Sequence, residues 1–285
     1  MSNLCSTNKN TYSISVVIAT LGGDSLFRTI EQLNSGSITP NEILICIPEE
    51  DTFRTKNFLF HNVKVIKTSC RGQVAQRAIG LQQAQCHMVL QLDDDIFLDE
   101  RAIEILALNL ELLGKKTAVS PVLNDIETGN SVYEHELRKG IIGWFYNIYA
   151  YVVCSSSWGI KRMGTVTKAG NNYGVISSIC GTKPFETQWL PGACVLCFKE
   201  DLILDEFYPL KGKAYCEDII HSYLRRKKGI RHWIIPKACC SISTLIHENV
   251  EAINARRYYV ELIRGSKWKF VLHCCFSKIK NLIKH

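Results

Sequence analysis

The sequence predicts an α/β fold with a mostly parallel sheet flanked by helices. Short, largely β-branched runs occupy residues 13–20, 42–47 and 63–67, and the first of them is almost wholly apolar. Helical patterns at residues 26–33 and 73–85 are interleaved with them. Runs that are apolar at every position are typical of strands buried on both faces. Strands that alternate with helices favour a parallel sheet with helices on both of its sides.

The later part of the chain continues this pattern with one interruption. We expect Asp99 to cap a helix over residues 99–113, because aspartate is favoured at helix starts. From residue 124 to 187 the periodicity fades and aromatic residues dominate; most would be core, and a minority would line a sugar site. The other elements expected are strands at residues 87–92, 118–123 and 231–236, a turn into a strand over residues 189–198 and a helix within residues 215–229.

Length and cysteine content limit the class of protein. A chain of 285 residues fits one large domain, or one domain with an appendage. We expect residues 1–11, which are polar, to form a disordered lead-in. The 13 cysteines are scattered, odd in number and often inside apolar runs, so we expect reduced thiols in a cytoplasmic protein.

The net charge of +7 is concentrated at the C-terminal end. Residues 256–285 hold eight basic groups against one acid, Glu261, so residues 1–255 are formally neutral. This distribution argues against a nucleic-acid-binding face. Residues 265–285 mix large apolar side chains with five lysines, as in a basic amphipathic helix on an anionic membrane. The alternative is a helix packed on the domain with its lysines in water.

Three adjacent carboxylates, Asp93, Asp94 and Asp95, follow the strand predicted at residues 87–92. Along an extended chain, Asp93 and Asp95 would point to one side and Asp94 to the other. Acids this close repel one another unless a cation or a proton is shared. A divalent cation held by carboxylates and substrate phosphates is the usual solution. The alternative is that the acids only cap the following helix.

Five segments of the chain stand out, in this order: Val16-Val-Ile-Ala-Thr20, Gly72-Gln-Val-Ala-Gln-Arg-Ala-Ile-Gly80, Leu92-Asp-Asp-Asp95, Trp189-Leu-Pro-Gly192 and Glu217-Asp218. As an ordered set, they resemble the family 2 glycosyltransferases with the GT-A fold. The similarity covers about residues 13–236.

The resemblance implies roles for several of these residues. Asp93 and Asp95 match the D-x-D motif, which carries Mn²⁺ or Mg²⁺ on the donor diphosphate, and Asp94 would join the donor site. Asp218 matches the catalytic base and Glu217 its neighbour, although both acids could simply complement a helix dipole. Thr20 and Arg77 would contact the donor, although Arg77 could equally be a solvated helix residue. The acceptor would bind near Trp189 and Gly192.

The sequence departs from the family pattern at three places. The first is Gln76-Arg77-Ala78, where the family has an Ala-Arg-Asn triplet. The family usually has a base-reading aspartate after the second strand, where this chain has Pro48-Glu49-Glu50-Asp51, so we expect Glu49 to substitute. The family often has a metal-binding histidine after the last strand; His247 is the nearest candidate and lies far along the chain. The nucleotide therefore stays open among UDP, dTDP and GDP.

Together, these features predict an inverting, metal-dependent glycosyltransferase that moves a sugar from a nucleotide diphosphate to a hydroxyl. Residues 12–123 would bind the nucleotide sugar, residues 124–245 would bind the acceptor and carry catalysis, and residues 246–285 would form the helical, basic tail. By family analogy, the acceptor is a glycan or lipid-linked glycan in bacterial O-antigen or capsule synthesis, at the inner face of the cell membrane. The alternative is a non-catalytic, glycosyltransferase-like scaffold or glycan-binding subunit.

Overall fold

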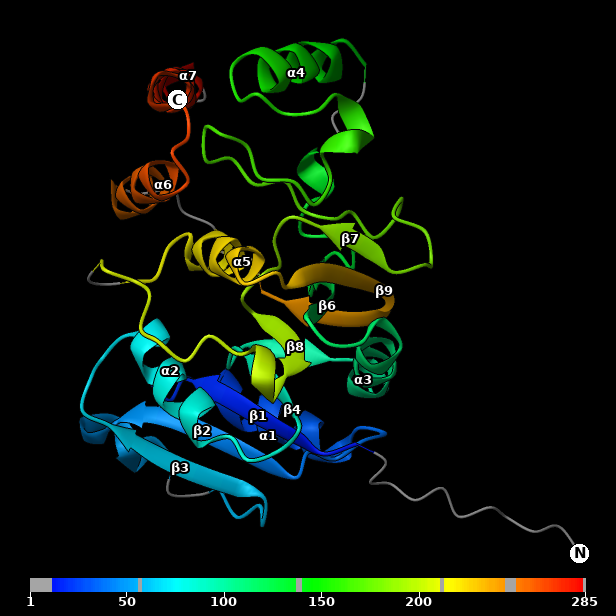
Figure 1. Cartoon of the computed structure of the whole chain (residues 1–285), viewed down its shortest axis with the longest axis vertical. Helices are drawn as coiled ribbons and strands as arrows, with labels where there is room; N and C mark the ends of the chain where they lie inside the picture. Colours follow the sequence, from blue (N-terminus) through cyan, green and yellow to red (C-terminus); the bar gives the residue numbers. More distant parts are fainter. Residues whose placement is uncertain (1–11, 56–57, 137–139, 211–212, 244–249, 284–285) are drawn as a thin grey trace, which may run out of the picture.

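The computed structural model describes residues 12–55, 58–136, 140–210, 213–243 and 250–283. The predicted lead-in and His247 lie outside these residues. Nine strands form one sheet in the order β3-β2-β1-β4-β8-β6-β9-β5, with β7 paired to β9 (Figure 1). The strands are β1 (Ile14–Ala19), β2 (Glu42–Pro48), β3 (Val63–Thr68), β4 (Met88–Leu92), β5 (Ile96–Leu98), β6 (Thr117–Asp125), β7 (Phe185–Thr187), β8 (Cys194–Phe198) and β9 (Arg231–Ile242).

The predicted α/β fold with a mostly parallel sheet is confirmed. Strands β1 to β4 are all parallel to one another, and β6 and β9 run in the same direction. Strand β8 lies between β4 and β6 and is antiparallel to both. Strands β5 and β7 pair antiparallel with β9. Six strands therefore point one way and three the other.

Helices cover both faces of the sheet because each central strand is apolar on both sides. Val16 and Ile18 pack into the core beneath α1 and α3, whereas Val17 faces α2. This is the alternation expected along an extended chain. The helices are α1 (Ser25–Ser35), α2 (Gln73–Gln83), α3 (Ala102–Leu113), α4 (Gly140–Val152), α5 (Glu217–Lys227), α6 (Val250–Leu262) and α7 (Lys267–Ile283).

Two elements differ from the sequence-based expectation. Helix α3 begins at Ala102 with Arg101 at its N-cap, so Asp99 does not cap it. The reason is that residues 96–98 continue the sheet as β5, and the Asp99 amide donates a hydrogen bond to the carbonyl of Cys239 (3.2 Å). Helix α4 lies within the segment that has no clear periodicity, because most of its surface, whether buried or exposed, is apolar.

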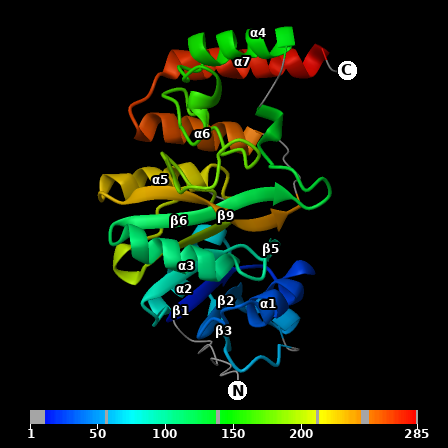
Figure 2. The ribbon, with the colours of Figure 1, turned by 90° about the vertical axis from the view of Figure 1, so that its right-hand side faces the viewer.

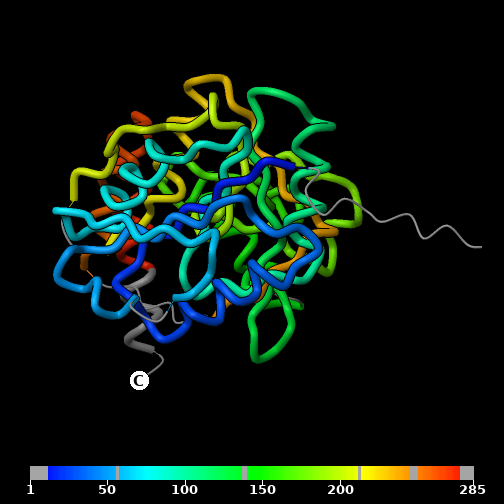
Figure 3. The backbone as a smooth tube through the Cα atoms, turned by 90° about the horizontal axis from the view of Figure 1, so that it is seen from below, coloured from blue at the N-terminus to red at the C-terminus, as the bar shows by residue number. Residues whose placement is uncertain are grey.

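The C-terminal segment is helical, as predicted for the tail. Helices α6 and α7 lie with α4 at the end of the molecule opposite β2 and β3 (Figure 2). Seen from the other end, the N-terminal strands lie in front and the C-terminal helices behind them (Figure 3). Within the described residues, no helix is long and apolar enough to cross a bilayer. Among the described residues, Cys46, Cys154, Cys194, Cys197 and Cys240 are buried thiols outside any disulfide.

Candidate active site

The three carboxylates of residues 93–95 lie in a turn between β4 and β5, at the carboxyl end of the parallel strands. The Asp93 amide still continues the sheet, donating a hydrogen bond to the carbonyl of Ala193 (2.8 Å). The chain then turns, so the simple alternation expected for an extended segment stops at Asp93. Ligands of open α/β sheets bind at this edge, so the candidate site lies here.

The Asp93 side chain is held by two donors from α2. Its Oδ1 accepts hydrogen bonds from Arg77 Nη2 (2.8 Å) and Gln73 Nε2 (2.9 Å). Burial raises the pKa of Asp93 to about 6; Arg77 opposes this rise, whereas the charges of Glu217, Asp95 and Asp94 add to it. Asp93 is thus a crowded, partly compensated carboxylate, and Gln73 is a partner that the sequence did not single out.

Arg77 links two acids that are 124 positions apart in the sequence. Besides Asp93, it donates through Nη1 to Glu217 Oε1 (2.8 Å), and its side chain is only 3% exposed. Burial alone would lower the pKa of Arg77, but the charges of Glu217 and Asp93 raise it above its ordinary value. Arg77 is therefore a buried cation between two carboxylates, which excludes the solvated-helix alternative.

Helix α5 begins at Glu217 next to this pair. Cys216 precedes it with φ of +58°, a left-handed conformation that is uncommon for residues other than glycine. Gly192 makes the close approach possible, because a Cβ atom at this position would lie 2.2 Å from Glu217 Oε1. The glycine of the Trp189–Gly192 segment thus makes room for an acid at the start of the helix.

Asp218 lies at the same helix start and has a strongly shifted pKa. Burial raises its pKa to about 7, and the charges of Glu217 and, more weakly, Asp93 add to this rise. A carboxylate poised near neutral pH suits a general base, since the ideal catalytic pKa lies near the working pH. The two acidic centres predicted from the sequence therefore share one electrostatic environment.

A pocket of about 590 Å³ opens beside the acids, a size suited to a small-molecule ligand. Thr20 and Asp94 lie at its wall, and the Thr20 hydroxyl bonds the Asp94 carboxylate. Gln76 fixes this wall by donating to the carbonyls of Thr20 and Cys46 (both 2.8 Å). Three cationic side chains also line the pocket: Arg54, Arg71 and Lys213. The pocket suits an anionic ligand.

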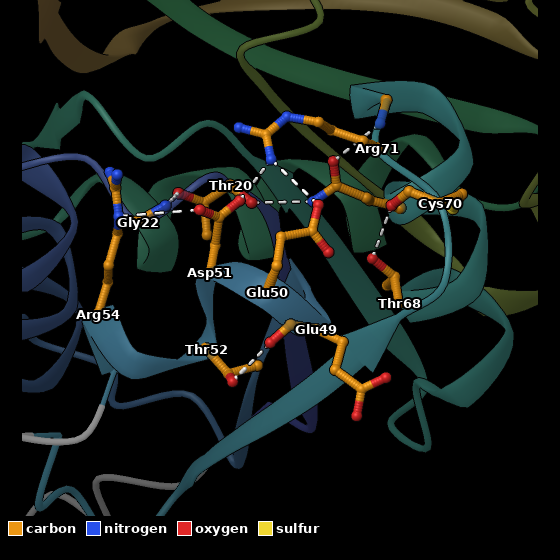
Figure 4. Close-up of polar contacts among 12 residues, drawn as sticks. Thr20, Gly22, Glu49, Glu50, Asp51, Thr52, Arg54, Thr68, Cys70 and Arg71 are labelled. Carbon is orange, nitrogen blue, oxygen red and sulfur yellow. Dashed lines mark hydrogen bonds and ion pairs between the residues drawn. The ribbon is translucent and has the colours of Figure 1, made fainter.

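After β2, the acids that pair with the pocket-lining Arg71 are Asp51 and Glu50, whereas Glu49 does not reach it (Figure 4). All three acids belong to the 3₁₀ turn η1 (Glu49–Thr55). The Asp51 side chain is 9% exposed and accepts a hydrogen bond from Arg71 Nη1 (2.8 Å). The Glu49 side chain is 75% exposed and pairs only loosely with Lys67 (3.9 Å). The structure thus places Asp51 beside the pocket-lining Arg71 and leaves Glu49 on the surface.

We expect Asp51→Ala to weaken nucleotide binding, because it removes a buried acceptor beside the pocket and leaves Arg71 only its bond to Glu50. A hydrogen bond to a charged group contributes about 1.5–3 kcal/mol, so the Kd should rise by about ten- to a hundredfold. Isothermal titration with nucleotide diphosphates would measure this change. Glu49→Ala is the matched control and should bind normally; equal losses in both variants would contradict the assignment.

Trp189 does not line this pocket. It is 3% exposed, and its Nε1 donates to the carbonyl of Tyr173 (2.9 Å). Its ring packs edge-on against Tyr133. Trp189 is thus a core residue in the segment that leads into β8, and it does not contact the pocket.

The acids provide a possible setting for a divalent ion. Within the described residues, no group of three or more His, Cys, Asp or Glu side chains is arranged to hold a metal. Burial and the charge of Asp94 raise the pKa of Asp95, so a cation would relieve the crowding of these carboxylates. Asp93 and Asp95 therefore fit an ion such as Mn²⁺ or Mg²⁺ only if donor phosphates complete its coordination.

Comparison with known proteins supports the fold class. No protein-family model and no curated protein matches the sequence. Among solved structures, GalNAc-T7 with UDP, GalNAc and Mn²⁺ superposes with a TM-score of 0.60 at 15% identity, covering 88% of this chain and 48% of that one. A mannose-1-phosphate geranyltransferase from Thermus thermophilus overlaps only partly, with a TM-score of 0.33 at 16% identity over 40% of this chain and 42% of that one.

The chain therefore has a GT-A-like glycosyltransferase fold. It spans about half the length of the GalNAc-T7 chain that it matches.

Proposed function

We propose that the protein is an inverting, metal-dependent glycosyltransferase of the family 2 type. The observation that carries this proposal is that the buried guanidinium of Arg77 bonds both Asp93 and Glu217. It ties the acids at the donor pocket to the helix start that carries Asp218. A transferase needs this proximity, because the donor and the proton acceptor must share one substrate complex.

The residues suggest how the reaction would proceed. Asp218 would take the proton of an acceptor hydroxyl as its oxygen attacks the anomeric carbon, while the bond to the diphosphate breaks on the opposite face. This single displacement inverts the anomeric centre. Glu217 Oε2 is buried with no hydrogen-bond partner among the described residues, so it would accept from the acceptor or orient it. Mn²⁺ or Mg²⁺ held by Asp93 and Asp95 would neutralise the departing diphosphate.

A survey of donors would test the activity. UDP sugars are the first choice, because the matched GalNAc-T7 structure contains UDP, GalNAc and Mn²⁺; dTDP and GDP sugars follow. The acceptor we propose is a glycan or lipid-linked glycan of a bacterial surface polysaccharide. Nucleotide release with Mn²⁺ would support transferase chemistry, and the anomeric configuration of the product would test inversion. A non-catalytic scaffold would release no nucleotide from any donor.

The pH dependence should follow Asp218. Because its folded-state pKa lies at about 7, kcat/KM should rise as pH increases through about 7 and fall about tenfold per unit below it. The raised pKa also means that ionisation destabilises the fold. The contribution of Asp218 to the free energy of unfolding therefore falls as pH rises from 3.8 toward about 7. A rate profile that is flat from pH 5 to 8 would contradict the assignment.

A further inference from the structure

Helices α4 and α7 lie together at one end of the molecule (Figures 1 and 2), and exposed apolar side chains gather on them. Of the 23 large hydrophobic side chains exposed among the described residues, ten lie on these two helices. Exposed apolar surface concentrated in this way marks a docking site for a protein or a membrane. The ten are Ile141, Ile142, Trp144, Phe145, Tyr151, Val152, Trp268, Val271, Leu272 and Phe276.

Helix α4 presents its apolar residues outward although no charged residue accompanies them. Its sequence, GIIGWFYNIYAYV, contains no Asp, Glu, Lys or Arg. Gly143 and Ala150 are its buried residues, and at 100° per residue they lie opposite Ile141, Phe145 and Val152. Those three side chains are 74%, 60% and 57% exposed. Helix α4 therefore packs on the protein through its small residues, and these large apolar side chains are exposed to solvent.

Helix α7 lies beside α4 and repeats this arrangement. Tyr149 of α4 packs edge-on against Phe276, and Lys269 Nζ donates to the carbonyl of Val152 (3.2 Å). Phe270 is buried, while Trp268 and Leu272 lie on the other side of the helix and are exposed. Over residues 267–276, the part of α7 whose side chains are described, the helix therefore packs on the protein through one face and leaves the other face uncovered.

The charge around this surface identifies its partner. Residues 256–276, whose side chains the structure describes, carry five basic groups against one acid, Glu261, next to an α4 that has no charged residue. A second copy of the chain would bring like charges together, which disfavours self-association through this surface. Anionic lipid headgroups would attract the basic groups, each worth about 1 kcal/mol near the surface. Trp144 and Trp268 are of the type that settles at the boundary between headgroups and acyl chains.

We propose that α4 and α7 together form a platform that binds the surface of an anionic lipid bilayer, with the α4 residues Ile141, Phe145 and Val152 entering the headgroup region. Helix α4, which the sequence did not connect with membranes, supplies the apolar anchor, and the C-terminal basic segment supplies the attraction. This inference does not depend on the sugar-transfer activity. It assigns a lipid surface as the partner of one end of the molecule.

Vesicle flotation with the full chain tests the platform. Vesicles of phosphatidylcholine with phosphatidylglycerol are compared with vesicles of phosphatidylcholine alone. We expect binding to the anionic vesicles, weakened by added salt, and at least tenfold weaker binding for the double variant Ile141→Glu/Phe145→Glu, since it places two charges in the apolar surface. The matched controls are Leu59→Glu and Leu112→Glu, which change residues 94% and 77% exposed elsewhere.

Both controls should bind as the parent does, and circular dichroism should show all variants folded, because every altered side chain is exposed. Three results would overturn the proposal. One is no binding of the parent chain to anionic vesicles. Another is undiminished binding of the folded double variant. The third is a parent dimer in light scattering, without vesicles, that this variant abolishes, because the platform would then be an interface between two copies.

Discussion

Replacing Asp218 by asparagine is expected to reduce sugar transfer by about 10²- to 10⁴-fold, the usual contribution of a general base. Asparagine keeps the shape of the side chain but cannot accept the proton of the acceptor hydroxyl. Donor affinity should change far less than the rate, because Asp218 does not line the pocket that holds Thr20 and Arg71. The measurement is kcat from nucleotide release together with the donor Kd from titration.

The matched control is Asp205→Asn, which alters an exposed aspartate outside α5 and should leave both quantities unchanged. The Asp218→Asn variant should also lose the rise in rate through pH 7 that Asp218 is expected to cause. An Asp218→Asn protein with full activity would show that the proton goes elsewhere, and the assignment of the base would then be wrong.

Replacing Arg77 by alanine is expected to give the largest loss of stability. Arg77 is 3% exposed and bonds both Asp93 and Glu217. Its removal leaves two carboxylates close together without their cation, and such a loss typically costs about 3–5 kcal/mol. Chemical denaturation would measure the change in the free energy of unfolding. We also expect binding of the sugar nucleotide to weaken, because Asp93 loses one of the two hydrogen bonds that orient its side chain.

Two further variants separate charge from geometry. Arg77→Lys keeps the positive charge but loses the planar fork that reaches both acids, so it should fold better than Arg77→Ala and still bind donor poorly. Arg101→Ala removes an exposed arginine that pairs with Glu104 and should change the free energy of unfolding little. A fully stable Arg77→Ala protein would contradict the account of the buried pair.

The strands were predictable from the sequence because their signal is local. Apolar runs such as residues 14–19 and 42–47 are buried at every position, and hydrophobic pattern alone fixes such elements. Helix α4 was not predictable in this way. A helix shows itself by the contrast between an apolar and a polar face, and α4 has apolar residues on its buried and its exposed sides alike.

The site was predictable in part. The acids of residues 93–95, Arg77 and Glu217-Asp218 could be selected by residue type and order, and the structure brings them together. Which acid after β2 is buried beside the pocket-lining Arg71 could not be selected. Three acids stand in a row there, and the turn of η1, together with the position of Arg71, decides that Asp51 is the buried one. The burial of Asp51 depends on these tertiary contacts, which the order of residues along the chain does not reveal.

The charge on Asp93 is among the causes that raise the pKa of Asp218. Neutralising Asp93, as a donor-bound cation would, must therefore make Asp218 more acidic. Thermodynamic reciprocity requires the converse, so that an ionised Asp218 favours occupancy of the donor side. Donor binding and ionisation of Asp218 are therefore thermodynamically coupled. Without donor, Asp218 should stay protonated to a higher pH than it does in the donor complex.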